Sequence, residues 1–288
     1  MVDLLFRSFE EHSIVWIILS AGVGGLIGAT IDFLLQNVLT SRMQSSKAAR
    51  DAINRYKYPL IQSVESLRKL IELLFQFVEA NREDMITDEY FKLSYLYTFG
   101  RFLALSEIIE DTAIFKYEPS SSRTKKLHIN FYGVFKAMTN FSYYQNIEEI
   151  PVDRVRAVTV PRLYLKAIGE IMVDRTVKES GEPGIPIGFV KFTTKYYTDK
   201  AFAQWFEPLV QLLDASWQGK QGLAWSRLVL LTTKLNVLSY TLDPRGKYTG
   251  WKSIRRLDDL HPEIRKRIVR ELEIGKMVRL IQKESNDA

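Results

Sequence analysis

Residues 14–31 read IVWIILSAGVGGLIGATI and contain no charged side chain. At ~1.5 Å of rise per residue, a helix of this length reaches about 27 Å, close to the ~30 Å hydrocarbon core of a bilayer. Continuing the helix to Leu35 covers the remaining distance, and Trp16 suits one membrane interface. The stretch therefore predicts a single membrane-spanning helix over residues 14–35. This helix would be surrounded by lipid and not by water.

Two other interpretations of this stretch are weaker. A buried core helix is the stronger competitor, because Asp32 and four glycines dilute the hydrophobicity. A cleavable signal peptide is disfavoured, because the leader sets Arg7 against Asp3, Glu10 and Glu11 where a positive region is required. We therefore expect residues 1–13 to remain as a short extracytoplasmic N-terminus.

The same residues imitate a dinucleotide-binding turn. The fingerprint G-x-G-x-x-G is matched at Gly22 and Gly24, but Ile27 stands at its third glycine and Gly28 comes one place late. The polar, helical sequence that follows lacks the second strand of such a unit. The glycines fit a membrane helix better, in which small residues let two backbones approach closely.

A ridge of small residues along this helix predicts self-association into a homo-oligomer. The ridge comprises Ser20, Ala21, Gly24, Gly25 and Gly28, with Gly24 and Gly28 forming a G-x-x-x-G pair. The alternative is that glycine is simply common in membrane helices.

The flanking charges predict the orientation. The N-terminal flank has one arginine, whereas a basic juxtamembrane helix expected over residues 36–57 carries five basic residues against Asp51. Basic residues stay cytoplasmic, so we expect the N-terminus outside, the C-terminal domain in the cytoplasm, and anchoring in the cell (inner) membrane. The absence of cysteine fits a reducing compartment.

The rest of the chain is rich in helical patterns and predicts an all-α protein: a cytosolic bundle over residues 58–242 and a basic helical segment over 243–288. Apolar residues spaced by three and four predict a long amphipathic helix over 45–80, which Pro59 interrupts. Further helices are expected over 87–115, 129–145, 152–179, 199–217 and 228–242, with a last one from Pro262 to about residue 283, and with loops over 118–128 and 180–188. Residues 189–197 fit either a short strand or the start of the next helix. The leucines between Leu228 and Leu242 form a short seam that is typical of core packing.

Four segments carry a resemblance. They are RYKYPLIQSVESLRKLIELL (55–74), YLYTFGRFLALSEII (95–109), AIGEIM (167–172) and RLVLLTTKLNVLSYTLDPRGKY (227–248). Together with the N-terminal apolar helix, the chain resembles uncharacterised prokaryotic proteins with one N-terminal membrane helix and a cytosolic all-helical domain. The resemblance implies a fold and a topology, and it carries no activity, cofactor or catalytic residue.

The sequence contains no recognisable catalytic or metal-binding motif. His12, His128 and His261 are scattered, and none has a second metal ligand at a suitable spacing. Adjacent acids such as Asp258 and Asp259 point to different faces of a helix and are expected to be solvated or to cap helices. We therefore expect no catalytic, cofactor-binding or metal-ligating residue, although distant residues can still assemble an enzyme site.

Charged residues suggest two contact regions. Asp32 lies either at the headgroup boundary or, in an oligomer, at the mouth of a pore. Residues 245–283 hold twelve basic residues against five acids, a net +7 in a chain of +6. The residues expected to contact anionic lipid headgroups or a protein partner are Arg42, Lys47, Arg50, Arg255, Arg256, Arg265, Lys266, Arg267 and Arg270. A solvated helix face is the alternative, and nucleic acid is disfavoured because no helix-turn-helix pattern stands out.

Two classes of function fit this layout. The first is a non-enzymatic, membrane-anchored effector that oligomerises through its N-terminal helix and permeabilises the membrane on a signal sensed by the cytosolic domain. An antiviral or stress-defence role suits such a layout by analogy alone. The second is a membrane-tethered adaptor whose bundle docks a cytosolic protein. Replacing the native membrane helix by an unrelated one separates the two, because only the adaptor tolerates the exchange.

Overall fold

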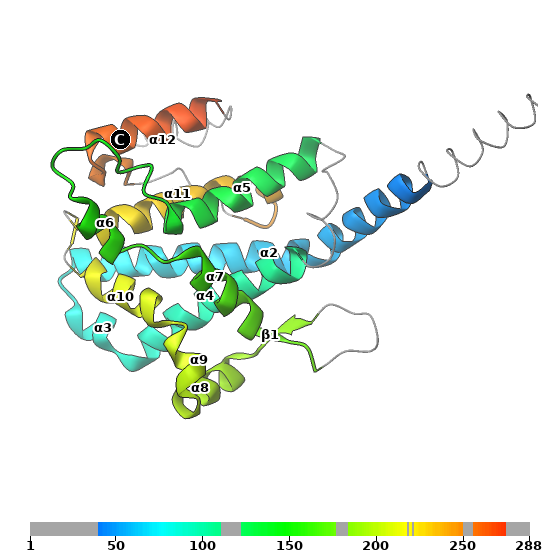
Figure 1. Ribbon diagram of the computed structural model, residues 1–288, viewed down its shortest axis with the longest axis horizontal. Helices are drawn as coiled ribbons and strands as arrows, with labels where there is room; N and C mark the ends of the chain where they lie inside the picture. The colour runs from blue at the N-terminus through cyan, green and yellow to red at the C-terminus, as the bar shows by residue number, and fades with distance from the viewer. Residues whose placement is uncertain are drawn as a thin grey trace, which may run out of the picture. The chain divides into compact units, whose positions relative to one another are not determined.

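A computed structural model describes residues 40–110, 122–176, 184–217, 219–220, 222–249 and 256–274 (Figure 1). The chain divides into two compact units, Met1–Asp51 and Ala52–Ala288. The predicted membrane helix, its small-residue ridge and Asp32 lie outside the described residues. Within the described ranges, no helix is both long enough and apolar enough to cross a bilayer.

The second unit is built almost entirely of helices, which confirms the predicted all-α class for the part of the chain that is described. The helices are α2 (Thr40–Glu79, which begins in the first unit), α3 (Glu83–Thr87), α4 (Glu89–Ile109), α5 (Ser122–Thr139), α6 (Val152–Ala157), α7 (Arg162–Ile171), α8 (Phe189–Thr198), α9 (Lys200–Gln204), α10 (Glu207–Ser216), α11 (Leu223–Leu242) and α12 (Pro262–Ile274), with a 3₁₀ turn at Leu257–Asp259. Two short strands, β1 (Val173–Asp174) and β2 (Ile185–Pro186), pair antiparallel with Val173 opposite Pro186.

Helix α11 forms the centre of the core. Its residues are buried on nearly every side, and it packs along α5 and against α10 (Figure 1). A helix that is apolar all round is stable in water only when other elements enclose it. The leucine seam from Leu228 to Leu242 is buried, so the prediction that it packs within the core is confirmed.

Helix α2 supplies one wall of this core. Leu60, Val64, Leu67 and Ile71 are buried at helical spacing, which confirms the predicted amphipathic helix. Pro59 lies inside α2 without ending it. An interior proline removes one backbone hydrogen bond and crowds the carbonyl four residues before it, so the tertiary packing of α2 has to offset a local cost of about 3 kcal/mol.

Helices α4 and α7 approach each other closely at Gly169. A Cβ added there would lie 3.0 Å from the Leu103 carbonyl oxygen and 3.4 Å from Glu107 Cβ. An alanine there would therefore have to push α4 and α7 apart by a few tenths of an ångström. Helix α4 begins where Asp88 accepts a hydrogen bond from the Phe91 backbone N–H at 3.0 Å, a standard side-chain N-cap.

Two segments that were each predicted as one continuous helix are divided in the structure. The described part of the segment 152–179 divides into α6 and α7 and then enters β1, because Pro161 disfavours helical geometry at the residue before it and starts α7 instead. The segment 199–217 likewise divides into α9 and α10, with Pro208 in the first turn of α10.

One predicted loop is corrected, and one open alternative is decided in favour of a helix. The loop expected over 118–128 is already helical from Ser122, where α5 begins. Residues 189–197 belong to helix α8 and form no strand. In α8, the Thr194 hydroxyl donates back to the Val190 carbonyl at 2.9 Å, so this hydroxyl is satisfied within the helix.

Candidate functional site

A groove of about 1150 Å³ lies along one face of α2, between Tyr58 and Gln76. Its lining is polar at the centre, where Glu65, Arg68 and Asn236 meet. Helix α2 contributes most of the lining, and α11 contributes Asn236. The groove is therefore positioned by the two helices that also build the core.

The floor of the groove is a buried ion pair. Arg68 Nη2 lies 2.8 Å from Glu65 Oε2, and the Ser239 hydroxyl donates to Glu65 Oε1 at 2.8 Å. Arg68 and Glu65 are only 6% and 9% exposed. Buried charges are stable when they are paired and hydrogen-bonded in this way.

Two buried polar atoms at this floor have no hydrogen-bond partner within the described ranges. They are Nε of Arg68, a donor, and Oδ1 of Asn236, an acceptor. Buried polar groups are nearly always satisfied by protein or water, so each unpaired atom calls for an explanation. Both atoms have almost no accessible surface, so a molecule in the groove would reach them only after neighbouring side chains move.

A tyrosine pair forms one end of the groove. The Tyr58 hydroxyl donates to the Tyr248 hydroxyl at 2.8 Å, and the rings meet edge to face at 4.8 Å. Asp243 fixes this end by accepting backbone hydrogen bonds from Tyr248 and Thr249 at 2.7 and 2.9 Å. Burial raises the pKa of Asp243, but these hydrogen bonds outweigh it and lower the pKa overall.

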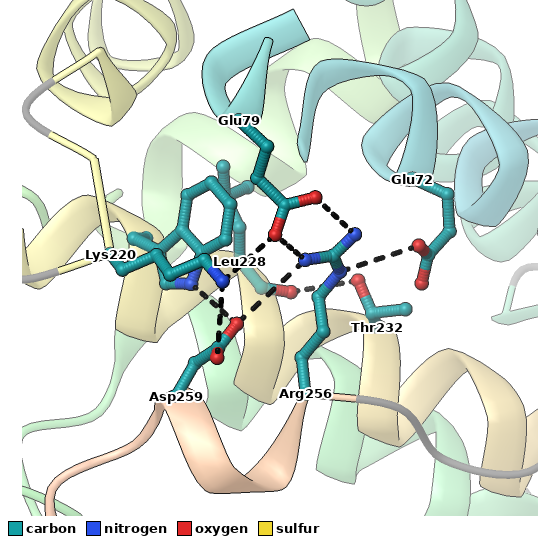
Figure 2. Close-up of polar contacts among 8 residues, drawn as sticks. Glu72, Glu79, Lys220, Leu228, Thr232, Arg256 and Asp259 are labelled. Carbon is teal, nitrogen blue, oxygen red and sulfur yellow. Dashed lines mark hydrogen bonds and ion pairs between the residues drawn. The ribbon is translucent and has the colours of Figure 1, made fainter. Parts of the chain in front are cut away.

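The C-terminal part of α2 is held by a network around Arg256 (Figure 2). The Arg256 guanidinium donates through both terminal nitrogens to the Glu79 carboxylate, at 2.5 and 2.9 Å. Its Nε lies 3.6 Å from Glu72. The guanidinium also lies over the Phe75 and Trp225 rings, 5.0 and 5.6 Å from their centroids.

Two further residues complete this network. Lys220 Nζ lies 3.0 Å from Glu79 Oε1 and 3.8 Å from Asp259 Oδ1 (Figure 2). Trp225 donates its indole N–H to Asp259 at 3.3 Å. The hydrogen bond from Arg256, aided by Lys220, lowers the pKa of Glu79 to about 2. Asp259, expected to be solvated or capping, is instead a member of this network with only 16% of its side chain exposed.

The backbone of Arg256 supports the importance of the network. Its φ of 68° is left-handed, a conformation that costs a side-chain-bearing residue about 1 kcal/mol or more. The multiple contacts of the guanidinium offset that cost. The local strain therefore places one arginine where it reaches two glutamates of α2.

Helix α12 docks on the core through an ion pair between a buried lysine and an exposed glutamate. Lys234 of α11, 5% exposed, lies 2.7 Å from Glu271 of α12, which also accepts a hydrogen bond from Tyr143 at 3.0 Å. Arg267 donates to the backbone carbonyls of Ser142 and Tyr143 at 3.1 and 3.0 Å. The basic C-terminal helix is thus attached by polar contacts around its apolar stripe.

Arg227 of α11 is a fully buried arginine without a carboxylate partner among the described residues. Its Nη1 donates to the carbonyls of Ala137 and Met138 at 2.9 and 2.8 Å, and its Nη2 donates to Thr159 at 2.8 Å. Burial lowers its pKa. The side chain satisfies the last carbonyls of α5, where a positive charge is favoured by the helix dipole.

The structure places the predicted basic contact residues in different environments. Arg256 and Arg267 turn toward the protein, and Arg265 forms an ion pair with Asp258 at 2.7 Å. Lys266 and Arg270 are exposed on α12. The side chains of Arg42, Lys47 and Arg50, and the whole of Arg255, lie outside what the structure describes, as do Ser20, Ala21, Gly24, Gly25, Gly28 and Asp32.

Sequence reasoning missed the residues that form the groove and the network. Glu65 and Arg68 each follow a buried apolar position of α2 by one residue, which places them beside the apolar stripe, and Asn236 and Ser239 interrupt a largely apolar helix. A polar residue at a core position has to find a partner, and this was the available signal. No local pattern pairs Glu79 with Arg256, which lies 177 positions away.

The polar groups of the groove can form hydrogen bonds and stack against a ring. The Ser239 hydroxyl is fully buried behind Glu65 and cannot reach a substrate in the groove. No group of three or more histidine or acidic residues suited to holding a metal ion occurs in the described part of the chain. The unpaired donor and acceptor, the paired charges and the tyrosines are suited to hydrogen bonding and stacking.

Comparison with known proteins gives no relative: no protein-family model, no curated protein and no solved structure matches the chain.

Proposed function

We propose that the chain is a non-enzymatic, membrane-anchored effector whose helical domain senses a signal and whose N-terminal helix oligomerises and permeabilises the membrane. The single observation that carries this proposal is the course of α2. This helix lines the groove, bears both glutamates that Arg256 holds, and extends back to Thr40, close in sequence to the apolar stretch 14–31.

The contacts of α2 suggest how a signal is transmitted. Glu65 and Arg68 are tied to Ser239 of α11, while Glu79 is tied to Arg256 and Lys220. A ligand changes an equilibrium only by binding one arrangement more tightly than another. A ligand that satisfies the unpaired groove atoms, or competes for these ion pairs, would favour one setting of α2 over another.

The proposal includes a location and partners. The protein lies in the inner membrane with its N-terminus outside, self-associates through the small residues of its apolar helix, and contacts anionic lipid through the basic start of α2. Asp32 would then ring the inner mouth of the assembly. Each of these features follows from the sequence between residues 14 and 57.

A helix exchange tests the proposal. Residues 14–35 are replaced by an unrelated membrane helix of equal length and without a small-residue ridge, and insertion is checked by sedimentation and carbonate extraction. Membrane potential and cell growth are then followed with a potential-sensitive dye after induction. The native chain should depolarise cells and the exchanged chain should not.

The controls separate anchoring from permeabilisation. Asp32→Asn should alter conductance while leaving insertion unchanged, and Asp88→Asn, which alters only the α4 N-cap, should leave conductance unchanged. If the exchanged chain retains full activity, the membrane-tethered adaptor becomes the better description. If the native chain stays in the supernatant after ultracentrifugation without detergent, both the effector and the tether are refuted.

A further inference from the structure

Helix α8 presents an apolar and aromatic face that no other described element covers. Val190 is 77% exposed, and Tyr197 at the other end of α8 is more than half exposed. Tyr90 of α4 is also exposed and reaches α8 through an edge-to-face contact with the Phe189 ring at 6.2 Å. The strand β2 ends just before α8 and adds one more exposed apolar residue. We call this set the α8 surface: Tyr90, Ile185, Val190, Thr194 and Tyr197.

The opposite face of α8 is fixed in the core. Phe192 is fully buried, and its ring lies 5.9 Å from that of Phe202 and 5.4 Å from that of Phe206. Helix α8 packs on α9 and on α4, and α8 and α9 lie together at the lower edge of the view in Figure 1. The α8 surface is therefore carried on a folded support and is not the frayed end of a helix.

The hydroxyl groups of α8 are already satisfied within the helix. The hydroxyls of Thr193 and Thr194 both donate to the Val190 carbonyl at 2.9 Å, and that of Thr198 donates to the Thr194 carbonyl at 2.8 Å. Polar groups have to be satisfied internally in this way wherever water is excluded. This face of α8 can therefore leave water without leaving a threonine proton unpaired.

Lysines lie beside this neutral face. Residues 188–205 contain Lys191, Lys195 and Lys200 against Asp199 as the one acid. The Asp199 carboxylate accepts the Phe202 backbone N–H at 3.1 Å and caps α9. Lys200 is exposed and forms no ion pair with a described residue.

The other acids near the α8 surface each have a partner. Asp174 binds Lys191, and Asp88 caps α4. Glu89 is hydrogen-bonded to the Tyr197 hydroxyl, which raises the pKa of that phenol. The charge that α8 and α9 leave available to a partner is therefore positive.

We propose that the α8 surface docks on a lipid bilayer whose leaflet carries anionic headgroups. The apolar side chains would enter the boundary between headgroups and acyl chains, the tyrosines would lie at the headgroup level, and the lysines would face lipid phosphates. An exposed apolar patch marks a contact with either a protein or a membrane. The lysines at its margin and the absence of hydroxyl protons free to pair with a partner favour the membrane.

This inference rests on the proposed function for the location of the chain, and it adds a second contact with the membrane. The N-terminal helix would hold the chain at the bilayer, and the α8 surface would select the face of the helical domain that lies against the lipid. A domain held at a second place has less freedom to rotate about its anchor.

A fluorescent label tests the contact directly. The chain contains no cysteine, so a single introduced cysteine can carry an environment-sensitive fluorophore at a chosen position. Val190→Cys is labelled in the full chain, which is placed in nanodiscs of phosphatidylcholine with or without phosphatidylglycerol. In the anionic discs, the emission should move to shorter wavelength, and lipid with brominated acyl chains should quench it.

Val152→Cys is the matched control for the label. Val152 is likewise an exposed valine, at 61%, but it lies on α6 and is followed by the charged Asp153. The emission of its label should remain that of a water-exposed fluorophore in both kinds of disc.

Lys200→Glu tests the electrostatic part of the contact without threatening the fold. Lys200 is the first residue of α9, where the helix dipole favours an acid. The change should lower the ratio of docked to free label in anionic discs about fivefold or more, while the melting temperature does not fall. Lys126→Glu, a change at an exposed lysine of α5, should leave the ratio unchanged.

Two results would overturn the proposal. One is equal emission from the Val190 and Val152 labels in anionic discs. The other is a shift at Val190 that brominated lipid does not quench, because a protein or a second copy of the chain would then cover the surface.

The outcome is separable from that of the helix exchange. The exchanged chain keeps a membrane anchor, so its Val190 label should report the same contact with lipid even where depolarisation is lost. Depolarisation by the native chain with an unquenched Val190 label would refute the α8 contact alone. If the chain is soluble without detergent, the same labels are read after vesicles of the two compositions are added.

Discussion

The ion pair between Glu79 and Arg256 makes a stability prediction whose size and pH dependence both follow from the structure. Glu79 has a pKa of about 2 against an ordinary value of 4.5, chiefly because of its hydrogen bonds with Arg256. At ~1.36 kcal/mol per pKa unit, that shift corresponds to about 3 kcal/mol as an upper bound. Since 32% of the Glu79 side chain is exposed, solvent screening reduces the expected contribution to about 1–2 kcal/mol.

The sign follows from the lowered pKa. A carboxylate whose pKa is lower in the folded state stabilises the fold fully above its unfolded pKa, and the contribution is lost as the pH falls from about 4.5 to about 2. We therefore expect Glu79→Gln to lower the melting temperature by about 2–8 °C at pH 7. The difference from the native chain should shrink steadily below pH 4.5.

The assay is thermal unfolding of the full chain in a mild detergent at pH 7, 5 and 3.5. Glu273→Gln, a change at an exposed acid of α12, serves as the control and should leave the melting temperature nearly unchanged. A Glu79→Gln gap that is absent at pH 7, or that stays constant between pH 7 and 3.5, would refute the assignment of this stability to the Arg256 pair.

Two further predictions concern the core. Glu271→Gln should destabilise the fold by about 1–2 kcal/mol in chemical unfolding, because it leaves the buried Lys234 charge unpaired, although solvent already screens the exposed Glu271. Adding Lys234→Met should recover most of the loss, and failure of the double variant to recover would show that the pair does more than neutralise charge. Gly169→Ala should destabilise the fold by about 1–2 kcal/mol, because the added Cβ meets the Leu103 carbonyl. Gly133→Ala is the matched control: its added Cβ meets only Lys234 Cδ at 3.6 Å, so it should stabilise the fold by about 0.5–1 kcal/mol. Equal effects of the two changes would contradict the close packing of α4 on α7.

The spacing of apolar residues correctly predicted helices whose pattern is set by burying their own side chains. The apolar spacing within α2 and the leucines of α11 predict helices that the structure contains, because burying one face requires that spacing. The errors in helix boundaries arose at prolines, because a proline can either lie within a helix or begin a new one. Pro59 continues a helix, whereas Pro161 starts a new one, and only tertiary packing distinguishes the two cases.

The candidate site was less accessible to sequence reasoning, because its contacts join distant segments. The net basic charge of the C-terminal region is a property of composition, but the direction of each side chain is not. Arg256 turns inward to Glu79 and Arg267 caps backbone carbonyls, while Lys266 remains exposed. Charge patterning therefore predicts that a region is basic without predicting which of its residues are free to contact a partner.

The polar residues of α11 give the strongest reason to regard the α2 groove as functional. Arg227, Lys234 and Ser239 all lie inside an apolar helix, and each finds a specific partner in the surrounding helices. Asn236 lies on the same helix and is equally buried, yet its amide oxygen remains unpaired where it meets the groove. The Oγ of Ser226 and the Nε of Arg227 on this helix are also unpaired, so the amide oxygen of Asn236 is distinguished by belonging to a residue that lines the groove. An apolar residue of similar size would be more stable there unless water or a ligand donates a hydrogen bond to that oxygen.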